Sequence, residues 1–458
     1  MTSGPGNVAL GAPAGRYYYC DYAWLGGTTA EPRVTLEVRE STIETVTVGQ
    51  PRPSGATHLV GLTLPGLANA HSHAFHRALR GRTERGEGSF WTWRDTMYRL
   101  AGSITPEQYF SLARAIYAEM ALAGMTTVGE FHYLHHPQEG GRYADSNEMG
   151  RAVLTAGWEA GVKVVLLDSC YLEAGPGRPL EGVQLRFGDR NVDAWAERAG
   201  ELAAEYGSAV GAAIHSLRAV PPAAASRIAA WATERGAPLH VHCSEQEAEN
   251  EEVRAAYGAA PVELLDEAGA LFPGSVAVHA THISDPDAER LGGSGTGVCI
   301  CPTTERDLGD GIGPARRLLG AGSPISLGSD SQAVVDPFEE MRALELDERL
   351  ATQRRGNFTT VQLLEAATSA GYAALGNPDG GRLEPGAPAD FVTIALDGPG
   401  LAGIEEDFLL EGAVFAASAR DVVDVVVDGR PVVAGGRHLL VGDVPGALRG
   451  AIGALSLS

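Results

Sequence analysis

The 458-residue chain lacks two features that define large classes of protein. No apolar run approaches the roughly 20 residues that a membrane-spanning helix needs, so we expect no membrane span. The formal net charge of −23 is the opposite of the basic excess that nucleic acid or an anionic membrane surface attracts. Neither of these is therefore an expected partner.

Paired cysteines and a secretory leader are also missing. The five thiols are odd in number and widely scattered, which is no disulfide framework, and the last two lie too close together to supply a zinc knot alone: Cys20, Cys170, Cys243, Cys299 and Cys301. The first residues, MTSGPGNVAL, contain neither a basic segment nor a hydrophobic stretch. Both features predict a cytoplasmic location.

What the chain does contain is a long alternation of strand-like and helix-like segments. After a β-rich start over residues 15–63, apolar runs of strand length are each followed by a segment of helical spacing. The eight candidate strands are LPGLANAHSH, MTTVGEFHYL, VKVVLLDSCYL, AVGAAIHSLRAV, PLHVHCSEQ, SVAVHATHI, TGVCICPTTE and PISLGSDSQ. Eight such units predict an α/β fold with a closed (β/α)₈ TIM barrel.

The two ends of the chain predict a second, smaller unit. Residues 383–458 are again rich in strands and turns, and we expect residues 1–63 and 383–458 to pair into one small β-sandwich beside a barrel of residues 64–382. Two long insertions, over residues 81–99 and 173–189, follow the first and third barrel strands. Long loops on this fold tend to build the site.

Most histidines lie near the predicted carboxyl ends of barrel strands, where barrel enzymes place their chemistry. Alternation along the first strand points His71 and His73 to the same face. Three imidazoles and one carboxylate suit Zn²⁺ and leave a position for water, with Fe²⁺ or Mn²⁺ as alternatives. We therefore predict one divalent ion held by His71, His73, His242 and Asp330.

Each of these residues also has a plain structural interpretation. His71 and His73 alone can be incidental, His242 and Glu245 can form a buried polar pair, and Asp330 can cap the following helix. Their joint occurrence at the ends of strands one, five and eight, with His279 at the end of strand six, favours a metal site.

The segments LPGLANAHSH, ADFVTIAL and VVDVVVDGR resemble those of the amidohydrolase superfamily, and the resemblance covers the full chain. Two-metal members generally bridge their ions with a carboxylated lysine from the fourth strand. Here that strand reads AAIHSLRAV, and the only lysine of the chain, Lys163, lies near the start of strand three. The resemblance therefore implies a mononuclear, deaminase-like centre, with Glu245 as the proton shuttle and with His279 and Asp330 orienting the nucleophile.

A narrower resemblance joins seven segments in the same order: SHAFHRALRGRT, GSFWTWRDTMYR, GEFHYLHH, HSLRAV, HCSEQ, HATH and CPTTERDLGDG. These are similar to the formimidoylglutamate deiminase family, which converts N-formimidoyl-L-glutamate and water to N-formyl-L-glutamate and ammonia in histidine degradation. The resemblance implies a homodimer and a small-molecule substrate with carboxylates.

The same resemblance assigns the substrate-binding residues. Arg94 and Arg218 are planar cationic groups suited to gripping two carboxylates. Tyr133, His215 and His76 are carried over as hydrogen-bonding partners, with His76 standing where many members have glutamine. His76 has the alternative of being an extra metal ligand.

A second departure is Arg306 and Asp307, where many members have an Ala-Asn pair. Two other functions compete with the deiminase interpretation. A purine or pyrimidine deaminase of the same superfamily would want a ring-stacking slot rather than two arginines. A non-catalytic relative would lack metal ligands, and none is missing here.

Overall fold

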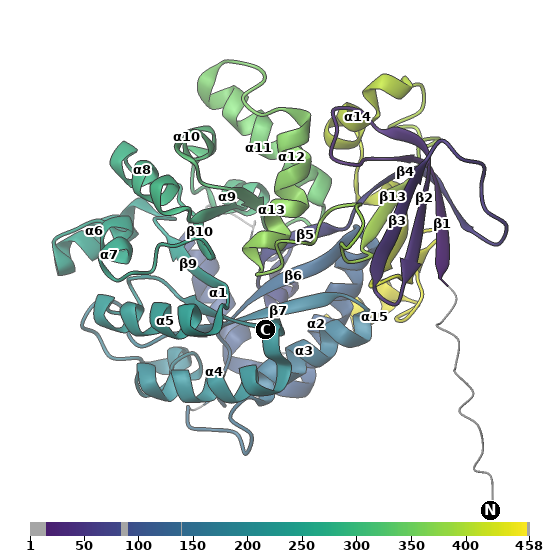
Figure 1. Cartoon of the computed structure of the whole chain (residues 1–458). Helices are drawn as coiled ribbons and strands as arrows, with labels where there is room; N and C mark the ends of the chain where they lie inside the picture. Colours follow the sequence, from purple (N-terminus) through teal and green to yellow (C-terminus); the bar gives the residue numbers. More distant parts are fainter. Residues whose placement is uncertain (1–14, 84–89, 139, 456–458) are drawn as a thin grey trace, which may run out of the picture.

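The computed structural model describes residues 15–83, 90–138 and 140–455, so part of the first predicted insertion, residues 84–89, lies outside the described residues. The chain forms two eight-stranded sheets (Figure 1). One is an all-parallel barrel from the middle of the chain, and the other combines strands from the two ends. The predicted fold class is confirmed.

The barrel strands follow chain order around the sheet. They are β5 (Leu67–Ser72), β6 (Met125–His132), β7 (Lys163–Cys170), β8 (Val210–Ile214), β9 (Leu239–Cys243), β10 (Ser275–His279), β11 (Gly297–Ile300) and β12 (Ile325–Leu327). Every one lies inside a predicted strand segment, and all but β7 and β11 are fully buried along their length. Such runs are typical of parallel strands with both faces covered.

The barrel closes where β12 meets β5. Ser72 and Asp330 form a parallel bridge, the Asp330 amide donates to the His71 carbonyl at 3.0 Å, and the His73 amide donates to the Asp330 carbonyl at 3.0 Å. The backbone of the closing seam therefore carries three residues of the predicted metal site.

Helices surround the barrel, and α1 to α10 lie between its successive strands along the chain (Figure 1). Their bounds are α1 Phe90–Ser103, α2 Pro106–Leu122, α3 Glu148–Ala160, α4 Val192–Tyr206, α5 Pro222–Arg235, α6 Glu247–Tyr257, α7 Pro261–Glu267, α8 Asp285–Ser294, α9 Pro302–Leu308, α10 Ala315–Ala321, α11 Pro337–Thr352, α12 Thr360–Ala367, α13 Ser369–Ala374, α14 Leu409–Phe415 and α15 Val444–Gly453. Local sequence sets the ends of several. Thr105 and Gln108 form a capping box at the start of α2, and Gly161 ends α3 with a φ of 74°. Among the described helices, none combines the length and the apolarity that crossing a bilayer requires.

The second sheet has the order β16-β15-β14-β13-β4-β1-β2-β3. Its strands are β1 (Arg16–Ala23), β2 (Glu31–Arg39), β3 (Thr42–Val48), β4 (Thr57–Pro65), β13 (Phe391–Ile394), β14 (Val422–Val427), β15 (Arg430–Ala434) and β16 (Arg437–His438). The edge strand β3 bonds back to the chain entering β13, because the Ile43 amide donates to Ala387 O at 2.9 Å and the Gly386 amide to Ile43 O at 2.8 Å. The sheet thereby encloses its own small core, which includes Tyr18, Leu36 and Phe391. The domain boundaries at 63/64 and 382/383 stay predictions.

Lys163 ties the barrel to the second sheet. It begins β7, at the end of the barrel opposite the carboxyl ends of the strands, and its ammonium contacts Asp390 and, at 3.1 Å, Asp428. The Asp390 side chain is 1% exposed and also accepts from the Tyr372 hydroxyl at 2.7 Å. The only lysine of the chain is thus held in a structural ion pair.

We expect Lys163→Met to lower the free energy of unfolding by about 2–3 kcal/mol, because it leaves the Asp390 carboxylate buried without its cation. The expected loss of unfolding free energy is smaller than that for breaking a fully buried ion pair, since the Lys163 side chain is 28% exposed. Urea unfolding measures the change, with Lys163→Arg expected to lose less. Arg39→Ala, which breaks an exposed pair with Glu44, is the control and should cost less than about 1 kcal/mol. Equal losses in Lys163→Met and Arg39→Ala would contradict the buried role.

Candidate metal centre and active site

The carboxyl ends of the barrel strands hold strained backbone. Ser244, His279 and Asp330 have positive φ angles of 52°, 71° and 41°, in the region that non-glycine residues rarely adopt. They follow or end three different strands, β9, β10 and β12. Strain of this kind persists where surrounding contacts enforce it, and it gathers at functional sites.

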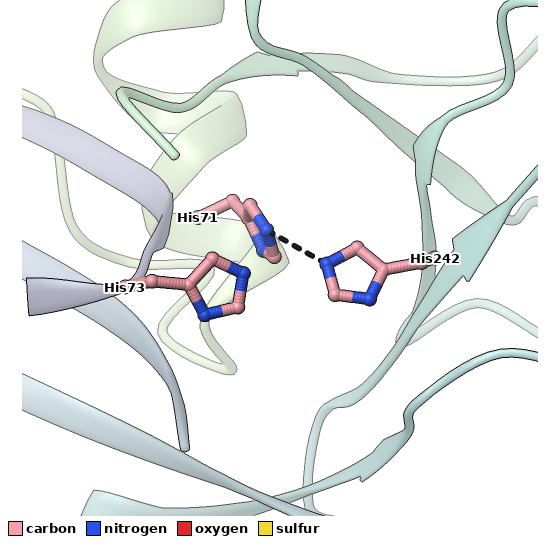
Figure 2. Close-up of side chains that lie close together, drawn as sticks. All are labelled: His71, His73 and His242. Carbon is pink, nitrogen blue, oxygen red and sulfur yellow. Dashed lines mark hydrogen bonds between the residues drawn. The ribbon is translucent and has the colours of Figure 1, made fainter. Parts of the chain in front are cut away.

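Three histidine side chains converge at this mouth. Ligand nitrogens of His71, His73 and His242 all lie within 4.8 Å of one another. Figure 2 shows the three rings pointing toward one another, and they come from β5, from the residue after it and from β9. The Nε2 atoms of His71 and His242 are 3.1 Å apart. Gly328 leaves room for this packing, because a Cβ there would lie 2.8 Å from the His71 Cβ.

The backbone fixes which nitrogen of two of these rings faces inward. His73 Nδ1 lies 2.9 Å from Phe131 O, and His242 Nδ1 lies 2.9 Å from His215 O. A carbonyl only accepts, so each Nδ1 carries the proton and each Nε2 presents a lone pair to the cluster. Burial lowers the pKa of all three histidines, which favours neutral rings. Converging lone pairs on buried neutral imidazoles fit a bound cation.

Asp330 adds a carboxylate to the cluster. Its Oδ1 lies 3.4 Å from the Nε2 atoms of both His71 and His73. Burial opposes ionisation, but the hydrogen bond from His71 is the largest of several influences that together hold the Asp330 pKa well below its usual range. His71, His279 and Asp330 form a second group whose ligand atoms lie within 4.8 Å of one another. Three histidines and a carboxylate therefore match the donor set of a divalent ion such as Zn²⁺.

Glu245 and His279 form an acid-base pair beside this cluster. His279 Nε2 lies 3.8 Å from Glu245 Oε1 and 3.8 Å from Asp330 Oδ2. Burial raises the pKa of Glu245 to about 7, close to the value that suits a group that both takes and gives a proton. Although burial opposes charge on His279, the carboxylate of Glu245 and a hydrogen bond to Glu305 raise the pKa of its ring.

Two buried glutamates that the sequence analysis did not single out support the site. Glu305 Oε1 lies 3.2 Å from His279 Nδ1 and accepts from the Cys301 amide at 2.9 Å. Glu130, at the carboxyl end of β6, accepts from the Ala74 amide at 2.7 Å and from the Ser72 hydroxyl at 2.9 Å. The sequence offered one signal for both, an acidic residue near a strand end. That signal was not enough to assign them, because the donors that a buried carboxylate needs do not show in the local sequence.

A pocket opens directly from the cluster. It is lined by His73, His242, Glu245, His279 and Asp330 together with every predicted substrate-binding residue: His76, Arg94, Tyr133, His215 and Arg218. The fold thus gathers side chains from the ends of β5, β6, β8, β9, β10 and β12 around one cavity, and the two long insertions add Arg94 and Phe187. Their individual roles stay predictions.

The two arginines in the pocket differ in surroundings. The buried Nε of Arg218 has no hydrogen-bond partner within the described residues. Burial disfavours its charge, but Glu249 and Glu245 more than compensate and raise its pKa. Arg94 comes from α1 and stacks over the Tyr98 ring at 5.4 Å. An unsatisfied buried guanidinium N–H is a ready donor for an anionic ligand.

His76 lies outside the converging ligand set. Its Nε2 is 2.8 Å from the Tyr133 hydroxyl, and its ring packs edge-on against Trp93 at 5.0 Å. Burial lowers the pKa of His76 to about 3, and that of His215 likewise to about 3. Both rings are therefore neutral hydrogen-bonding groups in the pocket wall.

Arg306, the other departure from the family pattern, faces away from the pocket. Its guanidinium pairs with Asp347 at 3.1 Å and Glu339 at 2.9 Å on the surface between α9 and α11. Asp307 is exposed. Arg306 therefore belongs to the helix surface and does not line the pocket.

A parallel barrel with histidines and an aspartate at its mouth, accompanied by a sheet from both chain ends, defines a class of barrel hydrolases. The model of the amidohydrolase family matches residues 62–432, and the chain belongs to that family.

Among curated proteins, formimidoylglutamate deiminase of Pseudomonas aeruginosa is 38% identical over 84% of this chain and 87% of its own length. A 5-methylthioadenosine/S-adenosylhomocysteine deaminase of Pelotomaculum thermopropionicum is 28% identical over 83% of each chain. Among solved structures, an amidohydrolase from Brucella melitensis is 32% identical with a TM-score of 0.89, covering 96% of this chain and 99% of its own.

We expect the purified protein to bind one Zn²⁺ per chain, and removal of the ion by a chelator to lower the melting temperature. Zinc at about 100 times its Kd should stabilise the fold by about 2.7 kcal/mol. His242→Ala should lose this zinc-dependent stabilisation, whereas His58→Ala, at a surface pair with Asp21, should keep it. Calorimetry with metal analysis checks both. Full zinc occupancy in His242→Ala would remove His242 from the site.

Proposed function

We propose that this protein hydrolyses the formimidoyl group of N-formimidoyl-L-glutamate, giving N-formyl-L-glutamate and ammonia. One observation supports this proposal most directly: a single pocket contains two sets of side chains. The first set is an acid-base pair beside a histidine cluster, and the second is the two guanidinium groups of Arg94 and Arg218. The formimidoyl carbon needs the first set, and the two carboxylates of the substrate need the second. The 38% identity to the Pseudomonas aeruginosa deiminase supports the same substrate.

The residues that would hold the metal are His71, His73, His242 and Asp330. When bound there, a divalent ion supplies a Lewis acid that lowers the pKa of water toward about 7. Zn²⁺ is the ion that the nitrogen-rich donor set favours, with Fe²⁺ and Mn²⁺ as alternatives.

The side chains around the cluster account for the proton movements. Water adds to the formimidoyl carbon while one of its protons passes to the Glu245 carboxylate and from there to the terminal nitrogen, which gives a tetrahedral carbon with one O–H and one NH2 group. The remaining O–H proton then reaches the same nitrogen through Glu245, and the carbon-nitrogen bond breaks so that ammonia leaves and the carbon keeps the oxygen as a formyl group. His279, held through Nδ1 by Glu305, and Asp330 position the attacking oxygen. The raised pKa of Glu245 suits it to both transfers.

The pocket wall suits the rest of the substrate. Arg218 offers an unsatisfied buried N–H, and Arg94 lies in the same cavity, so the two can each bind a carboxylate. Tyr133, His76 and His215 supply neutral hydrogen-bonding groups beside the reacting carbon. A purine or pyrimidine is the second candidate, because Trp93, Tyr171 and Phe187 also line the cavity. Two arginines favour the dicarboxylate, since a nucleobase carries no anion to pair with them.

The cellular compartment, the pathway and the oligomeric state are also part of the proposal. All five cysteines are buried and unpaired, which suits a reducing compartment and supports action in the cytoplasm. A place in histidine degradation and a homodimeric state follow from the resemblance to the deiminase family.

The purified, zinc-loaded protein should release ammonia from N-formimidoyl-L-glutamate, and not from guanine, cytosine or adenosine. Glu245→Gln should lower kcat by about 10²-fold or more while keeping its zinc, because the amide cannot carry the proton. An ammonia assay with metal analysis tests both expectations. Release from a nucleobase or nucleoside alone would refute the substrate, and near-normal turnover in Glu245→Gln would refute the proton transfer.

Arg218→Met should lower kcat/KM for N-formimidoyl-L-glutamate by about 10- to 100-fold, the loss of a charge-assisted hydrogen bond worth about 1.5–3 kcal/mol. The effect should fall mainly on KM, because the arginine binds a part of the substrate that does not react. The matched control is Arg178→Met, at the outer rim of the adjoining cavity, where the guanidinium pairs with Glu252 at 2.7 Å. An unchanged kcat/KM in Arg218→Met would remove this residue from the site.

A further inference from the structure

The segment DLGDG, which follows α9, carries a buried aspartate that the proposed reaction leaves unused. Asp310 is 3% exposed and stands between Gly309 and Gly311, whose φ angles are 72° and 108°. Residues with a Cβ atom rarely adopt such φ angles, so the two glycines allow the sharp turn that places the Asp310 side chain inside the protein. A carboxyl group is costly to bury without a purpose.

Three contacts connect Asp310 to the loops that carry the acid-base pair. Its Oδ1 accepts a hydrogen bond from the Gln246 side chain, in the loop after β9. Its backbone carbonyl accepts from His282 Nε2 at 2.8 Å, in the loop after β10. Its backbone amide donates to Glu305 O at 2.9 Å, in α9. One residue therefore joins the segments that contain Glu245, His279 and Glu305.

The contact with Gln246 bears directly on Glu245. Gln246 is the N-cap residue of α6, but its side chain makes no capping bond to the helix and turns to Asp310 instead. Glu245 is its immediate neighbour, and the preceding Ser244 has a φ of 52°. A strained loop of this kind needs an external anchor to hold its side chains in one place.

Electrostatics agree with this placement. After burial itself, the charge of Glu245 is the largest influence that raises the pKa of Asp310, to about 8. Asp310 Oδ2 is buried without a hydrogen-bond partner among the described residues. Only Oδ1 is thus engaged in holding the loop, and an asparagine would keep an acceptor at that position.

We propose that Asp310 is a positioning residue, which anchors the Gln246 side chain and thereby holds the Glu245 carboxylate at its working distance from His279. The inference rests on the proposed function in one respect: it takes Glu245 as the group that moves the proton. Asp310 itself touches neither the substrate nor the reacting atoms.

Asp310→Ala should lower kcat for N-formimidoyl-L-glutamate by about 10²-fold, since small displacements of a catalytic group have effects of this size. KM should change by less than about threefold, because the arginines that bind the carboxylates are untouched. Asp310→Asn should restore most of the kcat, because its side-chain oxygen accepts from Gln246 as before. Asp379→Ala, which changes an exposed aspartate that does not line the pocket, is the control and should keep kcat and KM.

Unchanged kcat in Asp310→Ala, or Asp310→Asn as slow as Asp310→Ala with zinc and fold intact, would overturn the proposal. A measurement that needs no substrate tests the contact between Asp310 and Gln246 independently of which substrate the protein takes. Melting temperatures of Asp310→Ala, Gln246→Leu and the double variant should be non-additive, with the second change costing little after the first. Additive losses would overturn the anchor even if the wild-type protein is a deiminase. Non-additive losses in a protein that releases no ammonia from N-formimidoyl-L-glutamate would support the anchor and refute the substrate.

Discussion

The closing seam of the barrel is the constraint on which the site depends. The last strand meets the first through backbone hydrogen bonds that Asp330 exchanges with His71 and His73. The same seam sets the Asp330 carboxylate 3.4 Å from both imidazoles. Predicted ligands about 260 residues apart in the sequence thus become neighbours through the barrel geometry itself. A fold that failed to close would lose this cluster of side chains together with the barrel.

Burial around this seam creates a second requirement, because carboxylates and imidazoles out of water need partners. The chain supplies such partners through further buried carboxylates, which bind the loops at the strand ends. Glu130 binds the turn after β5, Glu305 binds His279, and Glu340 of α11 accepts from the Thr303 amide at 3.0 Å. These contacts fix the turn after β5, the His279 ring at the end of β10 and the start of α9. Rigid supports of this kind keep catalytic groups at their working distances without touching the substrate.

These supports mark the limit of what the sequence predicts. The eight barrel strands could be predicted because hydrophobic runs and helical spacing are local patterns, and the histidines and Asp330 because strand ends meet at one face. Glu305 and Asp310 could not be assigned, since their partners come from other loops. Arg306 is the opposite case. The sequence marks it as a departure from a family motif, yet its side chain pairs with Asp347 on the surface. A motif states which residue is present, whereas the direction of its side chain depends on tertiary packing.

His76 differs from Arg306 because its departure does lie in the pocket. A glutamine at this position would offer both a donor and an acceptor from one amide group. The neutral His76 ring uses Nε2 for the Tyr133 hydroxyl at 2.8 Å, and its buried Nδ1 has no partner among the described residues. The His76 Nδ1 atom is therefore a further hydrogen-bonding group beside Tyr133, which lines the same cavity. A neutral imidazole offers one donor and one acceptor on opposite sides of its ring, so the histidine keeps a polar group at this point of the pocket wall while it changes the directions of the hydrogen bonds.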